Sequence, residues 1–356
     1  MRLSRSTFVL ACALVAAVSA TTADSTTTLR LQMRPSGHFA VENLAGTMTI
    51  VPGSSDQVVA VATIHAESED VLRKISFEQV SGENGTPTMR VIYPIEEYGT
   101  FRYPTGGSKF FGMFGGGSNT NTKYAGERVR VSDTTGVLLY ADVEIQLPSG
   151  ADAQFRNVVG KMTAEKVSGK LAFDTGSGEI MMTGLSGSIS ADTGSGNIIA
   201  EDIDGDFSGD TGSGDITLAK FEGEGIDCDT GSGDIRIDAS KANRIMTDTG
   251  SGDIRVEAET VEFQADTGSG DIDLVSDARI ERVDADTGSG DVTLVLGPEA
   301  SFEAHASIGS GDIVSRYPDA QAIVQKREVV GYRRGDGRTR IDVDTGSGDV
   351  VLRPTE

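Results

Sequence analysis

Glycine and apolar residues recur with a nine-residue period through the middle of the chain. An apolar residue stands two positions after seven of the eight glycines in this series, which are Gly160, Gly169, Gly178, Gly187, Gly196, Gly205, Gly214 and Gly223. Nine residues cannot hold a crossover helix between parallel strands, so each segment is predicted to be a turn followed by a short strand. Two such segments form one coil.

The motif D-T-G-S-G marks every second turn. It occurs eight times, and the copies from Asp174 to Asp286 begin 18 to 20 residues apart. A degenerate copy follows at Ser307, and the last copy begins 37 residues later, at Asp344. Regular repeats of this kind are typical of solenoids, in which each coil packs on the next. The sequence therefore predicts an all-β fold, a parallel β-solenoid with about 18–20 residues per coil. The long final gap predicts one coil that lacks the motif.

Alternation along each predicted strand indicates which residues form the core. Positions one and three before the motif Asp are mostly apolar, as in Phe173 and Leu171, and they share a face with the motif Thr. Cys228 falls on the same face. We therefore expect it to be a small buried core residue and not a reactive thiol.

Charge is distributed unevenly along the chain. The formal net charge is −23, and residues 174–315 hold 31 acidic and 7 basic residues. Such a charge argues against a nucleic acid partner, because phosphate binding needs a basic face. Residues 316–340 differ, with 7 basic and 3 acidic residues. This basic segment could dock on the acidic stripe of the solenoid.

Acidic residues at both ends of each Gly-Ser-Gly turn are predicted to face outward. Stacked coils would align them into two ladders, one through Asp174 and its equivalents and one through the residues equivalent to Asp215. Coils about 4.8 Å apart place like charges where they repel by about 1 kcal/mol in water, and by more near a protein surface. Either turn N–H groups bond to the carboxylates, or cations bind between the coils.

The second of these possibilities predicts a calcium-binding structural repeat module. Glycine- and aspartate-rich nine-residue repeats resemble the calcium-binding nonapeptide β-roll, although here the Asp and the apolar residue follow the Gly directly, as in Gly214-Asp-Ile. The candidate Ca²⁺ ligands are Asp210, Asp215, Asp229, Asp234, Asp248, Asp253, Asp266 and Asp271. No other cofactor is expected.

Residues 1–20 have the features of a cleavable secretory signal peptide. Arg2 and Arg5 precede an apolar run that ends in a small-residue cleavage site at Ala20. The run is too short for an ordinary transmembrane helix, so no stable membrane span is expected. Cleavage would remove Cys12 and leave a single thiol, so the exported chain, periplasmic or extracellular, would hold no internal disulfide.

Residues 21–150 form a predicted N-terminal β region in which apolar residues alternate without the strict period. It contains a predicted Gly-rich loop over 104–122, which includes Phe110, Phe111 and Phe114. We expect this region to cap or continue the stack of solenoid repeats formed by residues 151–356.

Catalytic motifs are matched only locally. The string Asp174-Thr-Gly-Ser resembles the aspartic protease signature, but that enzyme brings two such Asp together, whereas copies at one solenoid period line up along an edge. A glycan-active β-helix enzyme would need clustered carboxylates in a cleft, and the repeats single out no such cluster. His38, His65 and His305 are scattered, and we expect each at the surface. We therefore expect no enzyme activity and assign no catalytic residue.

The order of several segments is similar to that of a known family. These segments are 39–50, 58–63, 143–150 and 157–160, followed by the run of G-x-I half-coils. Together they resemble the exported bacterial β-solenoid family labelled "putative adhesin", a domain of unknown function, over roughly residues 37–352. The resemblance implies a right-handed parallel β-solenoid whose first coils come from the N-terminal region. It implies no catalytic residue.

The predicted function is that of a non-catalytic, exported adhesin-like or cell-envelope protein that presents an acidic, repetitive face. Many weak identical contacts along one ladder would add by avidity. The expected partner is a cell-surface or envelope component. The alternatives are the calcium-binding module and the glycan-active β-helix enzyme.

Overall fold

The structure is a computed structural model that describes residues 25–104, 119–278 and 280–355. The predicted signal peptide and Phe110, Phe111 and Phe114 lie outside the described residues. Within them the chain is nearly all β, with 27 strands, and no helix has the length and apolarity needed to cross a bilayer. The chain divides into two compact units, unit 1 up to Thr163 and unit 2 from Ala164.

Unit 1 contains two short helical segments, α1 (Glu69–Leu72) and η1 (Glu83–Gly85). Its strands are β1 (Ser25–Met33), β2 (Phe39–Ala45), β3 (Met48–Pro52), β4 (Val58–Ala66), β5 (Ser76–Ser81), β6 (Pro87–Ile92), β7 (Thr100–Arg102), β8 (Asn119–Tyr124), β9 (Glu127–Ser132), β10 (Val137–Leu147) and β11 (Ala151–Val159). The first residues of β8 belong to the loop predicted over 104–122.

Antiparallel and parallel pairing are mixed in unit 1. Strand β4 pairs antiparallel with both β1 and β10, and β10 pairs parallel with β3. Strand β2 pairs parallel with β6 and β11. Burial alternates along most of β4 and β10. Phe39 of β2, Phe155 of β11 and Phe101 of β7 are fully buried. The irregular pairing agrees with the absence of a strict period in this part of the sequence.

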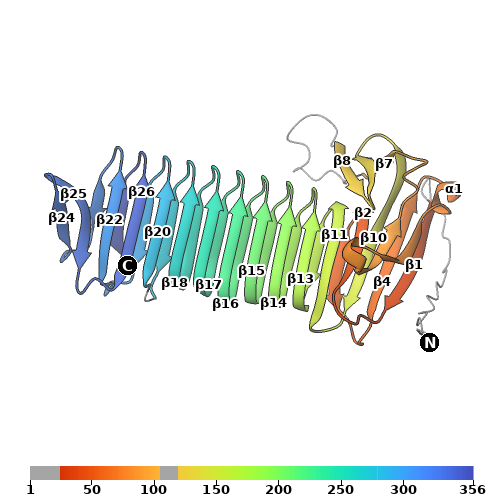
Figure 1. Cartoon of the computed structure of the whole chain (residues 1–356), viewed down its shortest axis with the longest axis horizontal. Coiled ribbons are helices and arrows are strands. Elements are labelled where there is room, and N and C mark those ends of the chain that lie inside the picture. The colour runs from red at the N-terminus through yellow and green to blue at the C-terminus, as the bar shows by residue number, and fades with distance from the viewer. Residues whose placement is uncertain (1–24, 105–118, 279, 356) are drawn as a thin grey trace, which may run out of the picture. The chain divides into compact units, whose positions relative to one another are not determined.

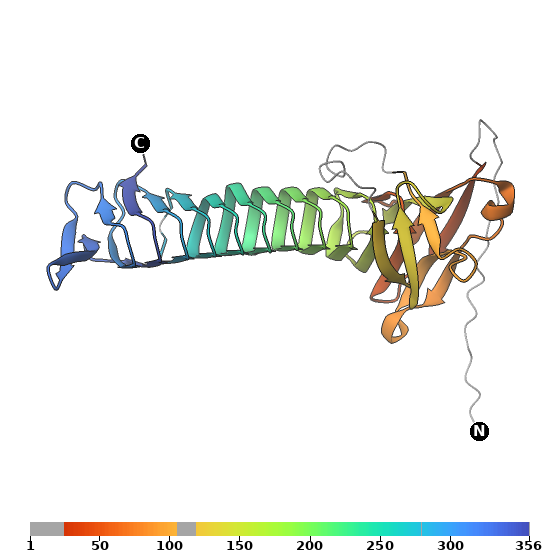
Figure 2. The same ribbon diagram turned by 90° about the horizontal axis from the view of Figure 1, so that it is seen from above.

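Unit 2 is built mostly from stacked parallel strands (Figures 1 and 2), and only β25 pairs antiparallel in its described residues, with β22 and β24. After β12 (Met162–Glu165), which crosses the boundary, its strands are β13 (Ser168–Thr175), β14 (Ile180–Thr193), β15 (Ile198–Thr211), β16 (Ile216–Thr230), β17 (Ile235–Thr249), β18 (Ile254–Thr267), β19 (Ile272–Ser276), β20 (Arg282–Thr287), β21 (Val292–Leu296), β22 (Phe302–Ile308), β23 (Ile313–Ser315), β24 (Gln321–Gln325), β25 (Glu328–Arg334), β26 (Thr339–Thr345) and β27 (Val350–Pro354).

Equivalent residues of successive repeats stack directly on one another in unit 2. Ile198 pairs with Ile216 and Ile216 with Ile235, so each apolar side chain packs against its counterpart in the next coil. The predicted inward residues Leu171 and Phe173 are each only 1% exposed. Cys228 is buried, as predicted, and this burial raises the pKa of its thiol. The large mostly parallel sheet and the apolar core were therefore correctly predicted.

The last coils stack in an order that differs from their order in the chain. Strand β26 lies between β20 and β22, so Asp344 pairs with Asp286 on one side and with Ser307 on the other. Strand β27 lies between β21 and β23 in the same way. The prediction of a coil without the motif before Asp344 is wrong. The intervening residues instead form the β24–β25 hairpin, and the chain then returns to fill the position between its two preceding coils.

Candidate functional site

The D-T-G-S-G turns lie side by side along unit 2 (Figure 1). Two rows of polar residues flank these turns. We call the row before the turns the Asp-Thr ladder, which in stacking order contains Asp174, Asp192, Asp210, Asp229, Asp248, Asp266, Asp286 and Asp344. We call the row after the turns the Gly-Asp ladder, which contains Asn197, Asp215, Asp234, Asp253, Asp271, Asp291, Asp349 and Asp312.

Buried threonines and close glycine contacts hold these turns together. The Thr249 hydroxyl donates to the carbonyl oxygen of Gly233 in the preceding coil at 2.9 Å, and it accepts from the N–H of Gly252 at 3.1 Å. The bond from Thr to the preceding coil recurs at Thr193, Thr211, Thr230, Thr267, Thr287 and Thr345. A Cβ atom on Gly252 would lie 1.9 Å from the Gly233 oxygen, so only glycine permits this approach.

Carboxylates of the Gly-Asp ladder bond to the backbone of the neighbouring coil. The N–H of Asp253 donates to the Asp234 carboxylate at 2.9 Å, and the N–H of Asp271 donates to the Asp253 carboxylate at 3.0 Å. Six such bonds to carboxylates, and one equivalent bond to the amide oxygen of Asn197, link the coils from Asn197 to Asp312 in the described residues, at 2.8 to 3.1 Å. Each hydrogen bond to a charged acceptor offsets part of the repulsion between neighbouring carboxylates.

Carboxylates of the Asp-Thr ladder have a different electrostatic environment. Burial raises the pKa of Asp192, Asp229, Asp248 and Asp286, and the negative charges on adjacent coils raise it further. Their ionised form is therefore disfavoured relative to an isolated aspartate. A cation that approached this row would relieve that repulsion.

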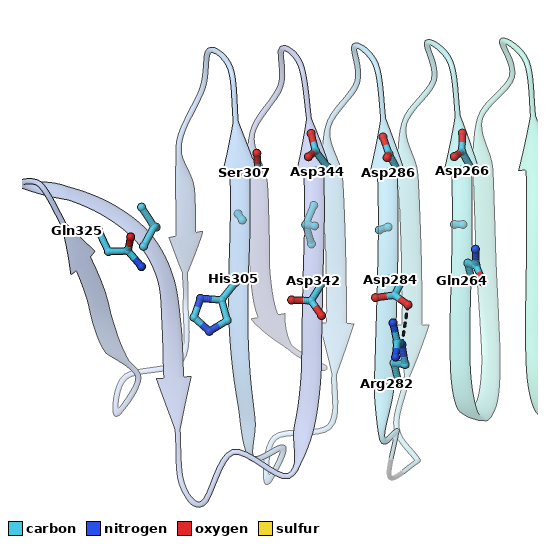
Figure 3. A pocket seen from close by; sticks show the side chains of 15 residues that line it. Gln264, Asp266, Arg282, Asp284, Asp286, His305, Ser307, Gln325, Asp342 and Asp344 are labelled. Carbon is cyan, nitrogen blue, oxygen red and sulfur yellow. Dashed lines mark hydrogen bonds and ion pairs between the residues drawn. The ribbon is translucent and has the colours of Figure 1, made fainter.

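An open groove of about 660 Å³ runs across part of the Asp-Thr ladder. Figure 3 shows Asp266, Asp286, Asp344 and Ser307 in one row of its lining and Gln264, Asp284, Asp342 and His305 in the row below. The β24–β25 hairpin contributes Gln325 and Val330 to the lining. Five aspartates and one arginine are among the residues that line the groove, so its surface is acidic. The arginine, Arg282, pairs with Asp284 at 2.6 Å.

Comparison with protein families places this architecture in a described group. The Toastrack DUF4097 family matches residues 142–353, which are 212 of the 356 residues. The chain belongs to the Toastrack DUF4097 family. This assignment covers all of unit 2 except its last residues, and it agrees with the β-solenoid-like stacking of the Toastrack chain.

Two solved structures are similar over most of the Toastrack chain. One is a "putative lipid binding protein" from Parabacteroides distasonis, with 10% identity, a TM-score of 0.40, and coverage of 92% of this chain and 97% of that chain. The other is a "putative adhesin" from Bacteroides fragilis, with 9% identity, a TM-score of 0.35, and coverage of 91% and 96%. Likenesses this distant assign no function. No curated protein matches the chain.

The candidate calcium ligands of the Toastrack chain fall into both ladders. Asp210, Asp229, Asp248 and Asp266 belong to the Asp-Thr ladder, and Asp215, Asp234, Asp253 and Asp271 to the Gly-Asp ladder. In the described residues no group of three or more His, Cys, Asp or Glu side chains is arranged to hold a metal ion. Stacking thus brings these candidates into rows but does not converge them on one point.

The histidines of the Toastrack chain lie apart, and each faces a carboxylate. His38 Nδ1 is 2.7 Å from Asp152, and His305 Nε2 is 3.2 Å from Glu303. His65 Nε2 is 3.2 Å from Asp142. Asp142 also accepts from the N–H and hydroxyl of Thr47, both at 2.8 Å. Burial opposes ionisation of Asp142, but these hydrogen bonds hold its pKa below the ordinary value.

Sequence reasoning missed the second row of the Toastrack groove. Asp284, Asp342 and His305 stand two residues before the motif position, so strand parity places them on the same outward face as the Asp-Thr ladder. This parity could have identified them. Strand parity could not have identified Gln325 of the β24–β25 hairpin as a lining residue. Gln325 reaches the groove because the last coils stack in an order that differs from their order in the chain.

Proposed function

We propose that this Toastrack chain is an exported, non-catalytic cell-envelope protein that binds a cationic surface component along its Asp-Thr ladder. The observation that carries the proposal is the row of in-register aspartates, which continues into the acidic groove. Within this row the pKa of Asp192, Asp229, Asp248 and Asp286 is raised. Ionised carboxylates that repel one another gain most from an external cation. The Gly-Asp ladder already has backbone donors, so a cation would gain less there.

Binding would depend on the same contact being repeated in successive coils. A partner with positive charges at a matching interval, about 4.8 Å or a multiple of it, contacts several coils at once. Each exposed ion pair contributes only about 0.2–1 kcal/mol, but linked contacts add by avidity. We further propose right-handed winding with 18–20 residues per coil, removal of residues 1–20 on export, and a β region over 21–150 that caps or continues the stack of 151–356.

A pair of matched charge variants tests the proposal. One variant of residues 21–356 replaces four aspartates of the Asp-Thr ladder with Asn, at Asp210, Asp229, Asp248 and Asp266. The control replaces four of the Gly-Asp ladder, at Asp215, Asp234, Asp253 and Asp271, so both lose the same net charge. Binding to an immobilised oligolysine surface is measured at low and physiological salt.

We expect the first variant to lose about tenfold or more in apparent affinity and the control to lose about threefold or less. Equal losses would mean that only net charge matters, and the ladder mechanism would be wrong. Binding that persists unchanged in high salt would also contradict it, because contacts between exposed charges are screened. Turnover of a glycan by the purified chain would favour the glycan-active alternative.

A further inference from the structure

The β8–β9 hairpin of unit 1 gathers basic side chains in a chain that is otherwise acidic. Residues 119–132, which form this hairpin, contain three basic residues and one acidic residue, whereas the whole chain has a formal net charge of −23. An open groove of about 560 Å³ lies over the hairpin. Lys123, Arg128 and Arg130 line it, and no acidic residue of the described chain does. We call these three side chains the basic face.

Strand parity separates the basic face from the buried face of the hairpin. Arg128 and Arg130 alternate along β9 with Val129 and Val131, which are only 4% and 3% exposed. The two arginines therefore point away from the core. The acidic residue of the hairpin, Glu127, also alternates with the arginines, so its side chain belongs to the other face. The basic face thus contains cations alone.

Two cations of the basic face lie directly opposite one another. Lys123 pairs with Arg128 across the strands, next to the residues that flank the two-residue turn Ala125-Gly126. The flanking residues share hydrogen bonds, so Lys123 and Arg128 form a non-hydrogen-bonded pair, in which side chains are closest. Like charges in this position are destabilising. In the described residues neither side chain forms an ion pair that would offset this repulsion.

The side chains over the hairpin are hydrogen-bond donors of the kind that bind phosphate. An arginine donates two parallel N–H bonds to a phosphate group, and a lysine adds a compact positive charge. Asn121 lies opposite Arg130 and adds an amide donor to the lining of the groove. A phosphate bound here would relieve the repulsion between Lys123 and Arg128, and no carboxylate of the groove lining would compete with it.

Exposure of the basic face favours a bilayer over a free phosphate ion. All three cations are exposed and the groove is open, so one small anion would stay largely hydrated and would gain little from each exposed pair. A bilayer presents many phosphates at once, and basic residues close to an anionic surface act together.

We propose that the basic face binds the phosphate headgroups of an anionic phospholipid bilayer. The chain as a whole is acidic and is repelled by such a surface, so attachment depends on this face. Salt screens contacts between exposed charges and weakens the attachment. The inference is independent of the proposed function, which concerns a cationic partner of unit 2.

Cosedimentation of the full mature chain with vesicles tests this proposal. One set of vesicles is phosphatidylcholine alone, and the other also contains phosphatidylglycerol. We expect binding to the second set only, and a loss of about tenfold or more in apparent affinity for the variant Lys123→Gln/Arg128→Gln. Binding of this variant at wild-type affinity, or equal binding of the wild-type chain to both sets of vesicles, would overturn the proposal.

A matched variant controls for net charge. Lys326→Gln/Arg327→Gln removes the same charge from two other exposed residues, in the turn of the β24–β25 hairpin, and should leave the affinity within about twofold of wild type. If both double variants lost affinity equally, the basic face would have no special role.

Thermal melts separate binding from a structural role of these cations. The variant Lys123→Gln/Arg128→Gln removes a repulsive pair, so we expect it to melt no lower than wild type. Arg128→Lys keeps the charge and should retain most of the binding. A double variant that melts well below wild type, together with lost binding in Arg128→Lys, would contradict an electrostatic contact.

Two further results would overturn the choice of a bilayer. Displacement by millimolar inorganic phosphate, beyond that caused by chloride at equal ionic strength, would indicate a site for a free anion. Self-association without vesicles that is lost in Lys123→Gln/Arg128→Gln would indicate that the basic face binds the acidic ladder of a second copy.

Discussion

The two ladders of unit 2 contain the same residue type at the same coil interval but differ in how the fold treats its charge. Asp229 and Asp234 flank a single turn. The Asp234 carboxylate accepts the N–H of Asp253 at 2.9 Å, whereas burial and neighbouring charges raise the pKa of Asp229. Spacing alone does not decide the electrostatics of a repeat, because the position of the nearest backbone donor matters as much.

This difference suggests a division of labour within one motif. The Gly-Asp ladder strengthens the stack through bonds between coils, whereas in the Asp-Thr ladder burial and neighbouring charges raise the pKa of Asp192, Asp229, Asp248 and Asp286. The following changes test that division, beginning with the largest expected effect.

Loss of the close glycine contact should disturb both ladders together. In Gly252→Ala the new Cβ would lie 1.9 Å from the Gly233 oxygen, so the two coils must separate. We expect a loss of roughly 3 kcal/mol in the free energy of unfolding, measured by urea denaturation. Gly225→Ala is the control, because nothing lies within 4 Å of that position. Equal effects at both sites would show that the contact is unimportant.

Removing a buried hydroxyl between the ladders should have the next largest effect. Thr249→Val leaves the Gly233 carbonyl and the Gly252 N–H without their partner, which should cost about 2 kcal/mol of stability. Thr175→Val is the matched control, because the Thr175 hydroxyl is buried with no hydrogen-bond partner. That change should be neutral or slightly stabilising. The comparison needs only thermal melts of the two variants.

Within the Gly-Asp ladder the acceptor should matter more than the charge. Asp253→Ala removes the acceptor for the N–H of Asp271 and should destabilise by about 1 kcal/mol. Asp253→Asn keeps an acceptor oxygen, as Asn197 does for Asp215, and should change stability by less than about 0.5 kcal/mol. If the Asn variant were as unstable as the Ala variant, the bond would not explain the ladder.

Within the Asp-Thr ladder loss of charge should be favourable. Asp248→Asn should stabilise by about 0.5 kcal/mol at neutral pH, since it removes repulsion at an exposed site. Folding raises the pKa of Asp248, so the folded state binds this proton more tightly than the unfolded state does. Protonation of Asp248 therefore stabilises the fold at low pH, and this stabilisation is lost as pH rises through the folded-state pKa. The gain from Asn should therefore vanish as pH falls towards 3.8. Melts at several pH values measure it.

Calcium should have the smallest effect. Since no described group of acids converges to hold a metal, millimolar Ca²⁺ should shift the melting temperature by less than about 2 °C relative to EDTA, through screening alone. A rise of many degrees would indicate binding to the native state. That outcome would favour the calcium-binding alternative, in which aspartates of both ladders are candidate Ca²⁺ ligands.

Local periodicity accounts for what could be predicted from the sequence. The alternation that buries Leu171 and Phe173 and exposes the motif aspartates is a property of each strand, so it is visible in a single repeat. The bond from the Asp253 N–H to Asp234 was not predicted, because it joins two coils and depends on their exact offset. From the sequence, the expected hydrogen-bond donors to these carboxylates were N–H groups of the turns.

The stacking order could not be predicted for a related reason. The coil that contains Asp344 matches the coil of Asp286 as well as it would match any other, so its sequence does not say between which neighbours it lies. The groove depends on this stacking order. The β24–β25 hairpin contributes to its lining, and this hairpin follows β22 and β23, which leave the position beside β20 and β21 to be filled later by β26 and β27. Near-identical repeats determine how one coil packs on another, but they do not determine which two coils are neighbours.

The position of the C-terminal coil has a consequence for how the molecule is completed during synthesis. Residues 302–334 leave the ribosome before residues 339–354, yet β26 and β27 lie beneath β22 and β23 in the stack. Growth by adding each new coil to the end of the array, which repeat proteins permit, therefore cannot finish this molecule. A chain without residues 339–354 would lack an inner layer and expose two facing strand rows. Residues 339–354 therefore close the stack only after the coils on both sides of them have been made.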